Sequence, residues 1–481
     1  MRTFRGTLTN VLLPDSRISS LQREAMRQKP HSIKALILMM RHGQLLIVIS
    51  VAAMMGCQGP GNSLGSPTFV TAHESSPFGV NTHLITYQQG DPLLGLSVQK
   101  MASAGVLWDR DSFYYATIES AEGQFNWQPF DDVVNKDLNS GINVLGLLCF
   151  GAMWWNTPVN DKEMSPLTDQ MLNDWSDFVR TVVERYKDQV HYWEIWNEEN
   201  TAMFWSPQPN PSDYVRLLKA AHDVITSVAS GSKIVMGGTA FIDTNYIQQV
   251  YNNGGGSYFN ILAVHPYEEA TPDSYTTGSS YPSDFVKSIA DLNAQFPGKP
   301  IWLTEMGWPT SSTSDQLQAD YLVRMYVQML SLSEIQKVFW YDFCNDATGD
   351  PSIDTMGLVQ RDSALSPKIG YYAYQTMAHL LQGASFQNQV QGPNIDSGNG
   401  LGDDIYQYRF VNGNKTVVAI WISGQVSGTG TSVTRSVTVN NVTASSATLV
   451  TLSGSTQTLT VVNGQYNVTA SQAPLYLVFS P

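Results

Sequence analysis

Between residues 77 and 384, eight short apolar segments alternate with helical patterns, and this alternation restricts the possible folds more than any other feature. Aromatic and β-branched residues fill each segment, which is typical of strands buried in a parallel sheet. The predicted strands are Phe78–Leu84, Val106–Asp111, Asn143–Phe150, His191–Glu198, Lys233–Gly238, Ile261–Tyr267, Pro300–Gly307 and Lys337–Phe343. Eight such strands separated by helices predict an α/β fold, a (β/α)8 TIM barrel.

The helical patterns between the strands support this prediction, and the clearest are Met171–Asp188, Ser212–Ser227, Ser283–Gln295 and Ser314–Leu332. A doubly wound open sheet is the alternative fold. Such a sheet usually carries a Gly-rich phosphate loop after its first strand, and the residues from Gly79 to His83 offer none. After a last helix at Lys368–Leu381, residues 385–481 turn to alternating Thr-, Val-, Ser- and Gly-rich segments, which predict a small C-terminal β-sandwich domain.

The N-terminal 57 residues resemble a secretion signal. A basic flank precedes an apolar run from Leu45 to Met55, and Gly56 and Cys57 follow it, as in a bacterial lipoprotein signal peptide. The run is too short for a comfortable transmembrane helix, although a buried helix is an alternative interpretation. We therefore expect lipidation at Cys57 and a lipoprotein of the bacterial cell envelope, periplasmic or at the cell surface. Residues 58–76 are rich in Gly, Ser, Pro and Thr and predict a flexible linker.

The net charge limits the binding partners of the chain, and the cysteines limit its disulfides and metal sites. The formal net charge of −14 argues against nucleic acid and against anionic lipid headgroups, so we expect membrane contact by the lipid anchor only. Cys149 and Cys344 fall on the third and eighth predicted strands, which are not neighbours in sequence order, so we expect no disulfide between them. No Cys/His spacing indicates a metal site, and we expect no cofactor.

Two of the predicted strands end in a carboxylate. Strand alternation places Glu194, Trp196 and Glu198 on one face, with Glu198 at the C-terminal mouth where barrel enzymes keep their catalytic groups. The seventh strand ends in the same way at Glu305. Two such carboxylates are the minimum equipment for cleaving a glycosidic bond. Glu199 is the local competitor, and alternation places it on the opposite face.

At this point the motifs resemble a known group of enzymes. Trp-Asn-Glu at 196–198, Leu-Thr-Glu at 303–305, His-Pro-Tyr at 265–267 and Trp340 are similar to motifs of the retaining glycoside hydrolases of clan A. The resemblance is strongest to family 39, with family 5 second, and the motifs follow the order of the fourth, sixth, seventh and eighth strands. One departure bears on the family: Glu199 and Asn200 follow the acid/base position, where many relatives have Pro.

The resemblance implies a role for each matching residue. Glu198 would be the general acid/base and Glu305 the nucleophile, with their carboxyl groups about 5–5.5 Å apart. Glu198 must hold a proton at the first step while Glu305 is ionised. The other implied site residues are Asn197 on the sugar 2-hydroxyl, Arg110 paired with Glu305, Tyr267 hydrogen-bonded to Glu305, and Trp340 beneath the sugar. His265 and His83 would contact the substrate or else pack as hydrogen-bonded residues.

The sequence therefore predicts a retaining glycoside hydrolase that cleaves β-glycosidic bonds of a polysaccharide by double displacement. Long segments at 151–168 and 199–211 predict a built-up rim and favour endo action. Four Trp residues are candidates for lining a cleft, or alternatively for packing between barrel and helices: Trp154, Trp155, Trp205 and Trp308. A transglycosylase and a non-catalytic carbohydrate-binding or assembly lipoprotein remain alternatives, and xylan, mannan, glucan and a self-made exopolysaccharide all remain open as substrates.

Overall fold

The computed structural model describes residues 74–87, 90–155, 165–166, 168–267, 271–274, 283–391, 405–423, 435–439, 444–460 and 465–479. The predicted signal segment with Cys57, and nearly all of the predicted linker, lie outside the described residues. None of the described helices is long and apolar enough to cross a membrane.

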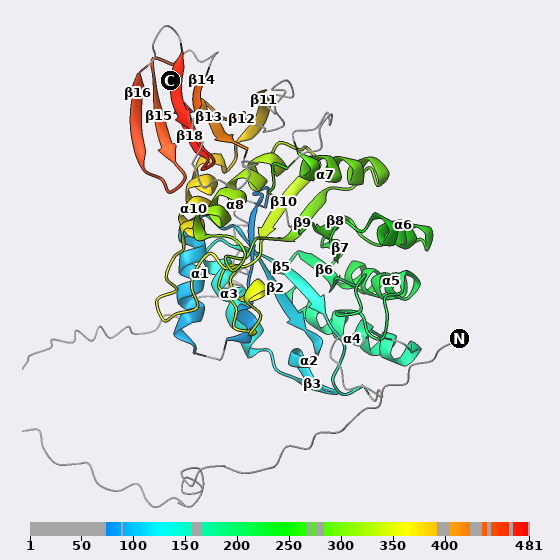
Figure 1. The fold of residues 1–481 in the computed structure, drawn as a ribbon. Helices are drawn as coiled ribbons and strands as arrows, with labels where there is room; N and C mark the ends of the chain where they lie inside the picture. The colour runs from blue at the N-terminus through cyan, green and yellow to red at the C-terminus, as the bar shows by residue number, and fades with distance from the viewer. Residues whose placement is uncertain are drawn as a thin grey trace, which may run out of the picture. The chain divides into compact units, whose positions relative to one another are not determined.

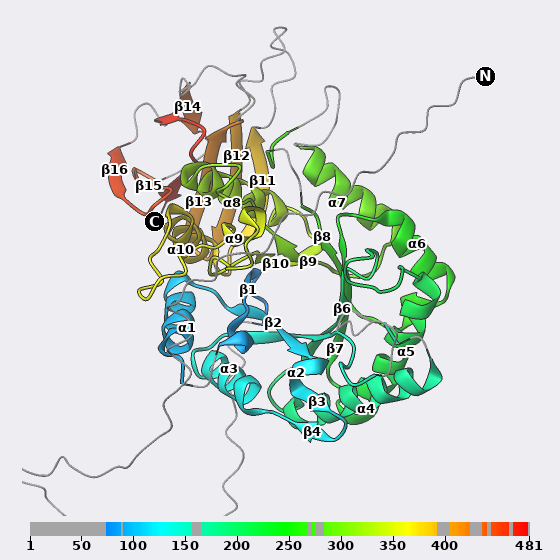
Figure 2. The same ribbon diagram turned by 60° about the horizontal axis from the view of Figure 1, so that its bottom comes forward.

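Eight parallel strands close into a barrel, which confirms the predicted fold class (Figures 1 and 2). The strands in barrel order are β1 (Phe78–Asn81), β2 (Trp108–Tyr114), β5 (Asn143–Cys149), β6 (Tyr192–Asn197), β7 (Lys233–Ala240), β8 (Leu262–His265), β9 (Ile301–Met306) and β10 (Ile335–Trp340). The main helices around them are α1 (Pro92–Ala104), α3 (Gln128–Asn139), α4 (Asp169–Tyr186), α5 (Pro211–Val228), α6 (Thr244–Asn252), α7 (Asp284–Gln295), α8 (Asp315–Met329) and α10 (Ile369–Leu381).

Smaller elements decorate the loops. A 3-10 turn η1 (Leu84–Thr86) follows β1, and another, η2 (Gly255–Ser257), follows α6. The connection from β2 to α3 holds α2 (Tyr115–Ile118), β3 (Glu119–Ala121) and β4 (Gln124–Phe125), and α9 (Pro351–Asp354) follows β10. Several helix starts carry a side-chain cap, as at Ser314, whose hydroxyl accepts the amide of Leu317.

Side chains fill the base of the barrel. One apolar cluster gathers residues from six of the eight strands or from their starts: Trp108, Leu145, Val235, Ile261, Ala263, Trp302 and Phe339. Trp108 and Trp302 meet edge to face, with ring centroids 5.6 Å apart. The N-terminal end of the barrel is therefore filled by packed side chains, and only the C-terminal ends of the strands are available for chemistry.

The C-terminal residues form the predicted β-sandwich. Six antiparallel strands lie in the order β11 (Ser385–Gln391), β12 (Ile405–Asn412), β13 (Lys415–Ile422), β18 (Leu475–Phe479), β15 (Ser446–Thr451) and β16 (Thr456–Thr460). A two-stranded sheet pairs β14 (Arg435–Val439) with β17 (Tyr466–Ala470). Val418 of the larger sheet and Val439 and Val468 of the smaller one share a hydrophobic core, so the two sheets pack face to face.

The sandwich also contacts the barrel. Arg324 of α8 is fully buried, pairs with the buried Asp273 at 3.2 Å, and donates from Nε to the carbonyl of Gln472 at 3.2 Å. The hydroxyl of Tyr406 donates to the carbonyl of Asp273. These contacts tie the loop after β8, which follows the predicted site residues His265 and Tyr267, to the C-terminal sheets.

Candidate active site

Glu198 and Glu305 face each other at the C-terminal mouth of the barrel. Glu305 lies in β9, and Glu198 follows the last residue of β6. One carboxylate oxygen of each lies within 4.8 Å of the other, and their side chains are 14% and 12% exposed. Glu199 instead is fully buried beside Gly237, where an added Cβ would lie 2.4 Å from its Oε2. The geometry therefore brings Glu198 rather than Glu199 to Glu305.

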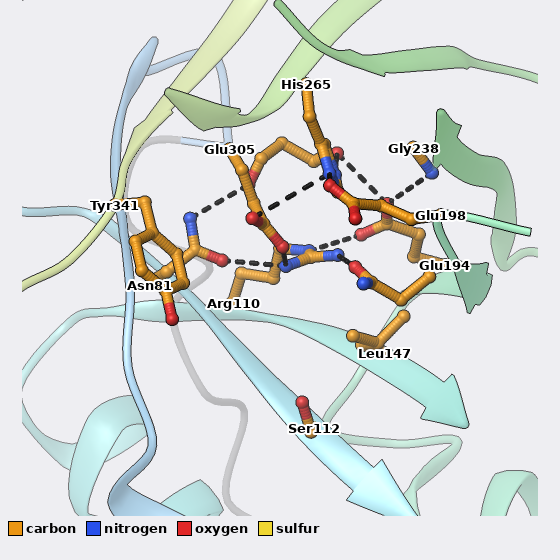
Figure 3. Close-up of polar contacts among 12 residues, drawn as sticks. Asn81, Arg110, Ser112, Leu147, Glu194, Glu198, Gly238, His265, Glu305 and Tyr341 are labelled. Carbon is orange, nitrogen blue, oxygen red and sulfur yellow. Dashed lines mark hydrogen bonds and ion pairs between the residues drawn. The ribbon is translucent and has the colours of Figure 1, made fainter. Parts of the chain in front are cut away.

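Arg110 of β2 connects the predicted site residues (Figure 3). Its Nη1 donates to Glu305 Oε1 at 2.7 Å, and its Nη2 donates to Asn197 Oδ1 at 2.8 Å. Its Nε donates to Glu194 Oε2 at 2.5 Å, and Nη1 also donates to Asn81 Oδ1. The predicted pairing of Arg110 with Glu305 is thus present, and the guanidinium is only 4% exposed. Such charge-assisted bonds in a buried setting fix both partners.

The surroundings keep Glu305 ionised. Burial alone would raise the pKa of Glu305, but the charges of His265 and Arg110 outweigh it. Hydrogen bonds from Tyr267 and Arg110 act in the same direction, and the pKa of Glu305 is lowered overall. The hydrogen bond predicted from Tyr267 is present, with its hydroxyl 2.9 Å from Glu305 Oε2. A carboxylate held in this form can act as a nucleophile.

A chain of hydrogen bonds places a proton between His265 and Glu198. The Thr304 hydroxyl donates its single proton to Glu194 Oε1 at 3.0 Å, so its oxygen can only accept from His265 Nε2, 3.0 Å away. Nε2 therefore carries a proton. The other ring nitrogen, Nδ1, lies 3.0 Å from Glu198 Oε1. Whether that bond joins a neutral imidazole to a carboxyl or an imidazolium to a carboxylate, one further proton lies between Nδ1 and Oε1.

The backbone at Trp196 departs from the predicted alternation. Trp196 has φ of 73°, and its fully buried indole leaves the site to pack against Trp175 and Trp205. The prediction that Trp196 shares a face with Glu194 and Glu198 is therefore wrong. Because of this turn Asn197 also faces the mouth, where it meets Arg110.

Trp340 does not lie under a sugar. It is fully buried, its indole donates to the carbonyl of Met356, and its ring packs beside Trp308. The predicted role for Trp340 is therefore wrong, because the side chain has no free face. The next residue, Tyr341, is the partly exposed aromatic on the Glu305 side of the site (Figure 3).

His83 lies close to Tyr341, with Nε2 3.3 Å from the hydroxyl. The same nitrogen lies 3.7 Å from Asp342 and 3.8 Å from Asp346, and these three groups are close enough to surround a cation. Tyr341 already donates to Asp346 Oδ2 at 3.3 Å, however, so the cluster is an internally bonded wall of the mouth. A substrate contact by His83 stays a prediction.

The Trp candidates for the cleft pack instead of lining it. Trp155, Trp205 and Trp308 are 6%, 1% and 3% exposed, so their prediction as cleft residues is wrong, and Trp154 is only partly exposed. The prediction did not include four residues that the structure brings to the site: Asn81, Glu194, Thr304 and Tyr341. Of these four, only Glu194 had a signal in the sequence, because strand alternation placed it on the same face as Glu198, the face predicted to point into the barrel.

Comparisons with known proteins agree with this geometry. A protein-family model described as the glycosyl hydrolase catalytic core matches residues 116–372, more than half of the chain. Endo-1,4-beta-xylanase C of Paenibacillus barcinonensis is 31% identical over 85 residues, which are 17% of this chain and only 8% of that protein. The chain thus spans less than a tenth of the length of that relative.

Solved structures share the fold. A family 39 glycoside hydrolase from Bacteroides cellulosilyticus WH2 superposes with a TM-score of 0.68 at 24% identity, over 84% of this chain and 81% of that one. The GH39 enzyme from Xanthomonas axonopodis pv. citri reaches 0.59 at 16% identity, over 85% and 94%. A GH30 endoxylanase from Clostridium papyrosolvens C71 reaches 0.59 at 15% identity, over 84% and 96%.

These matches agree with the resemblance read from the motifs, since family 39 enzymes are among the similar structures. The family model covers the barrel from α2 to α10, including both strands that carry the paired carboxylates. The chain belongs to the glycosyl hydrolase catalytic core family.

Proposed function

We propose that the protein is a retaining glycosidase that cleaves β-glycosidic bonds of a polysaccharide by double displacement. The observation that carries the proposal is the short separation of Glu198 and Glu305, whose nearest oxygens lie within 4.8 Å. Retaining enzymes place their carboxyl groups about 5–5.5 Å apart, whereas inverting enzymes leave about 6.5–9.5 Å for a water molecule. The gap here suits direct attack by one carboxylate.

In the first step the ionised Glu305 attacks the anomeric carbon. The proton held between Glu198 and His265 passes to the glycosidic oxygen as its bond to that carbon breaks. Asn197 Oδ1 accepts from Arg110, so its amide NH2 is the group that can donate to a sugar hydroxyl. Tyr267 releases its hydrogen bond to Glu305 Oε2 or keeps it on the new ester.

In the second step water replaces the leaving group. Glu198, now without its proton, takes one from the water, whose oxygen attacks the anomeric carbon and frees Glu305. Arg110 is held by Glu194 throughout, because that carboxylate is fully buried and takes no part in the reaction. The guanidinium therefore keeps a counter-charge while Glu305 is esterified.

We further propose a β-xylan-like substrate and endo action. Two of the similar proteins are a xylanase and an endoxylanase, and this supports a xylosidic substrate class. A cavity of about 240 Å³ opens at the C-terminal ends of β2 and β5, lined by residues that include Tyr114 and Phe150. The cavity lies at the same C-terminal face of the barrel as Glu198 and Glu305, and this supports binding of more than one sugar.

The test is hydrolysis of xylan, mannan and β-glucan by the wild-type protein, with NMR of the first-formed anomer and sizing of the products. Glu305→Gln should lose activity by at least about a thousandfold and Glu198→Gln by about a hundredfold or more. Glu184→Gln, an exposed carboxylate on α4, is the matched control and should keep full activity. An α first product from a β-linked substrate would refute the retaining mechanism. A protein that binds one polysaccharide but cleaves none would favour the non-catalytic alternative.

A second test addresses the proton at Glu198. Thr304→Val keeps the shape of the side chain but removes the acceptor for His265 Nε2, which destabilises the protonated pair. kcat/KM should therefore fall in Thr304→Val, and Thr304→Ser should restore it. An unchanged kcat/KM in Thr304→Val would contradict the assigned direction of the hydrogen bonds.

We also propose that Cys57 is lipidated and anchors the protein in a bacterial cell envelope. The support is the apolar run that ends before Gly56 and Cys57. Fractionation of cells should find the wild-type protein with membranes and the Cys57→Ser protein released from them. Equal partition of the two proteins would contradict the anchor.

A further inference from the structure

Phe241 is an exposed aromatic ring on a strained backbone at the mouth of the barrel. It directly follows β7 and is 62% exposed, although it is a large apolar side chain. Its φ is 59°, in the left-handed region that bulky residues rarely adopt. A single exposed Phe needs no explanation by itself, but exposure combined with strain does, since strained residues cluster at binding sites.

The neighbouring elements hold Phe241 in this conformation. Its amide donates to the carbonyl of His265 at 3.0 Å, and its carbonyl accepts from the Thr239 hydroxyl at 2.9 Å. Asn200, on the segment after β6, bonds both backbone groups of Ala240, the residue before Phe241. The Asn200 side chain accepts from the amide of Ala240 at 2.9 Å and donates to the carbonyl of Ala240 at 3.1 Å. Four hydrogen bonds from β7, β8 and the segment after β6 therefore fix the backbone that carries the ring.

The ring lies on the acid/base side of the catalytic pair. β7 is the neighbour of β6, which leads to Glu198, and Glu198 donates its amide to Gly238 of β7. His265, which bonds Glu198 through its ring, also pairs through its backbone with Phe241. On the other side of Glu305 lies Tyr341, which follows β10 (Figure 3). A group that protonates the leaving oxygen must lie on the leaving-group side, so the departing sugar lies towards β6 and β7.

We propose that Phe241 is a stacking platform for the first sugar of the leaving group. The inference rests on the proposed glycosidase function, because that function decides which side the leaving group occupies. Sugar rings present apolar C–H faces, and an exposed aromatic ring gains by covering such a face. The backbone strain is then the cost of aiming an aromatic ring into solvent at a position that glycine would occupy more easily.

The test compares two substrates that differ only in the leaving group. Xylotetraose places sugars over β7, whereas β-xylobiosyl fluoride has fluoride as its leaving group and offers nothing to stack. Phe241→Ala should lower kcat/KM for xylotetraose by about tenfold relative to kcat/KM for the fluoride, and Phe241→Trp should restore the ratio. Tyr372→Ala is the matched control, because Tyr372 is 43% exposed on α10 and should leave the ratio unchanged.

Phe241→Gly separates binding from folding. Glycine adopts the left-handed backbone without strain, so this variant should unfold at the same temperature as the wild-type protein or higher, yet show the same loss on xylotetraose. An equal fall on both substrates, or no fall on either, would overturn the platform while the proposed function stands. A wild-type protein that cleaves neither substrate would overturn the proposed function, and the platform with it.

Discussion

Replacement of Asp137 by Asn should stabilise the protein, and increasingly so as the pH rises. Asp137 on α3 is fully buried, together with Asp109 of β2. Neither oxygen of Asp137 has a hydrogen-bond donor among the described residues when it is a carboxylate. Asp109 already accepts the Thr82 hydroxyl on both oxygens. Two buried carboxyl groups can satisfy each other only if one holds a proton.

The size of the effect follows from the proton. Burial raises the pKa of Asp137 to about 8, a hydrogen bond with Asp109 lowers it, and the charge of Asp111 raises it. An unfolded aspartate titrates near about 3.9. Between these values the folded protein keeps a proton that the unfolded chain loses, so the free energy of unfolding falls by about 1.4 kcal/mol per pH unit. The contribution is complete below pH of about 4 and is lost as the pH rises through about 8.

The full difference gives an upper limit of about 6 kcal/mol. The proton is shared with Asp109, and real interiors respond more than a rigid low-dielectric medium, so we expect about 1–3 kcal/mol at pH 8. For a protein of this size that corresponds to a rise in Tm of about 1–4 °C. Because the pH distance from about 3.9 is nearly four times greater at pH 8 than at pH 5, the gain should grow about fourfold between them.

Thermal unfolding of the wild-type and Asp137→Asn proteins between pH 5 and pH 9, followed by circular dichroism, measures this gain. Asp132→Asn, on the same helix but partly exposed, is the matched control and should leave the unfolding temperature nearly unchanged. A gain for Asp137→Asn that stays constant over this range would refute the reasoning, because the stabilisation would then have another origin than the proton.

Three further substitutions test other contacts. Arg110→Met should lower the free energy of unfolding by about 3–5 kcal/mol in urea denaturation and abolish activity, because it leaves two buried carboxylates unpaired. Gly238→Ala should lower kcat/KM about a hundredfold in a folded protein, since its Cβ would lie 2.1 Å from His265 Nε2. Arg324→Met should cost about 3–5 kcal/mol, because buried Asp273 loses its partner, and limited proteolysis should show earlier cleavage near the C-terminal sheets.

The barrel and its paired carboxylates were predictable because their signals are local. An apolar strand that ends in a carboxylate needs no knowledge of the rest of the chain, and both Glu198 and Glu305 had that pattern. The partners of these residues were less accessible. Arg110 and Glu194 are 84 residues apart, and only closure of the barrel brings them together.

The errors arose where the backbone leaves regular geometry. Alternation assumes an extended backbone, so the left-handed conformation of Trp196 turned its indole out of the site and brought Asn197 in. The same sensitivity explains why the aromatic residue at the mouth is Tyr341 and not the predicted Trp340. Neighbouring residues at the end of a strand face opposite sides, and a difference of one position exchanges a fully buried side chain for one at the mouth.

The distribution of strain separates the two proposed catalytic carboxylates. Among the described non-glycine residues four have positive φ, and three of these, Trp196, Glu198 and Phe241, lie at the ends of β6 and β7. Such conformations cost about 1–3 kcal/mol each and persist only where surrounding contacts over-determine them. Glu305 lies in β9 where the pairing with β10 shifts register between Leu303 and Met306, and it is oriented by ion pairs and hydrogen bonds to its own side chain. Glu198 bonds His265 through its side chain and is also positioned through its backbone, which donates to Gly238 and accepts from Thr201. Changes in the packing around β7 should therefore impair acid/base catalysis before they impair nucleophilic attack.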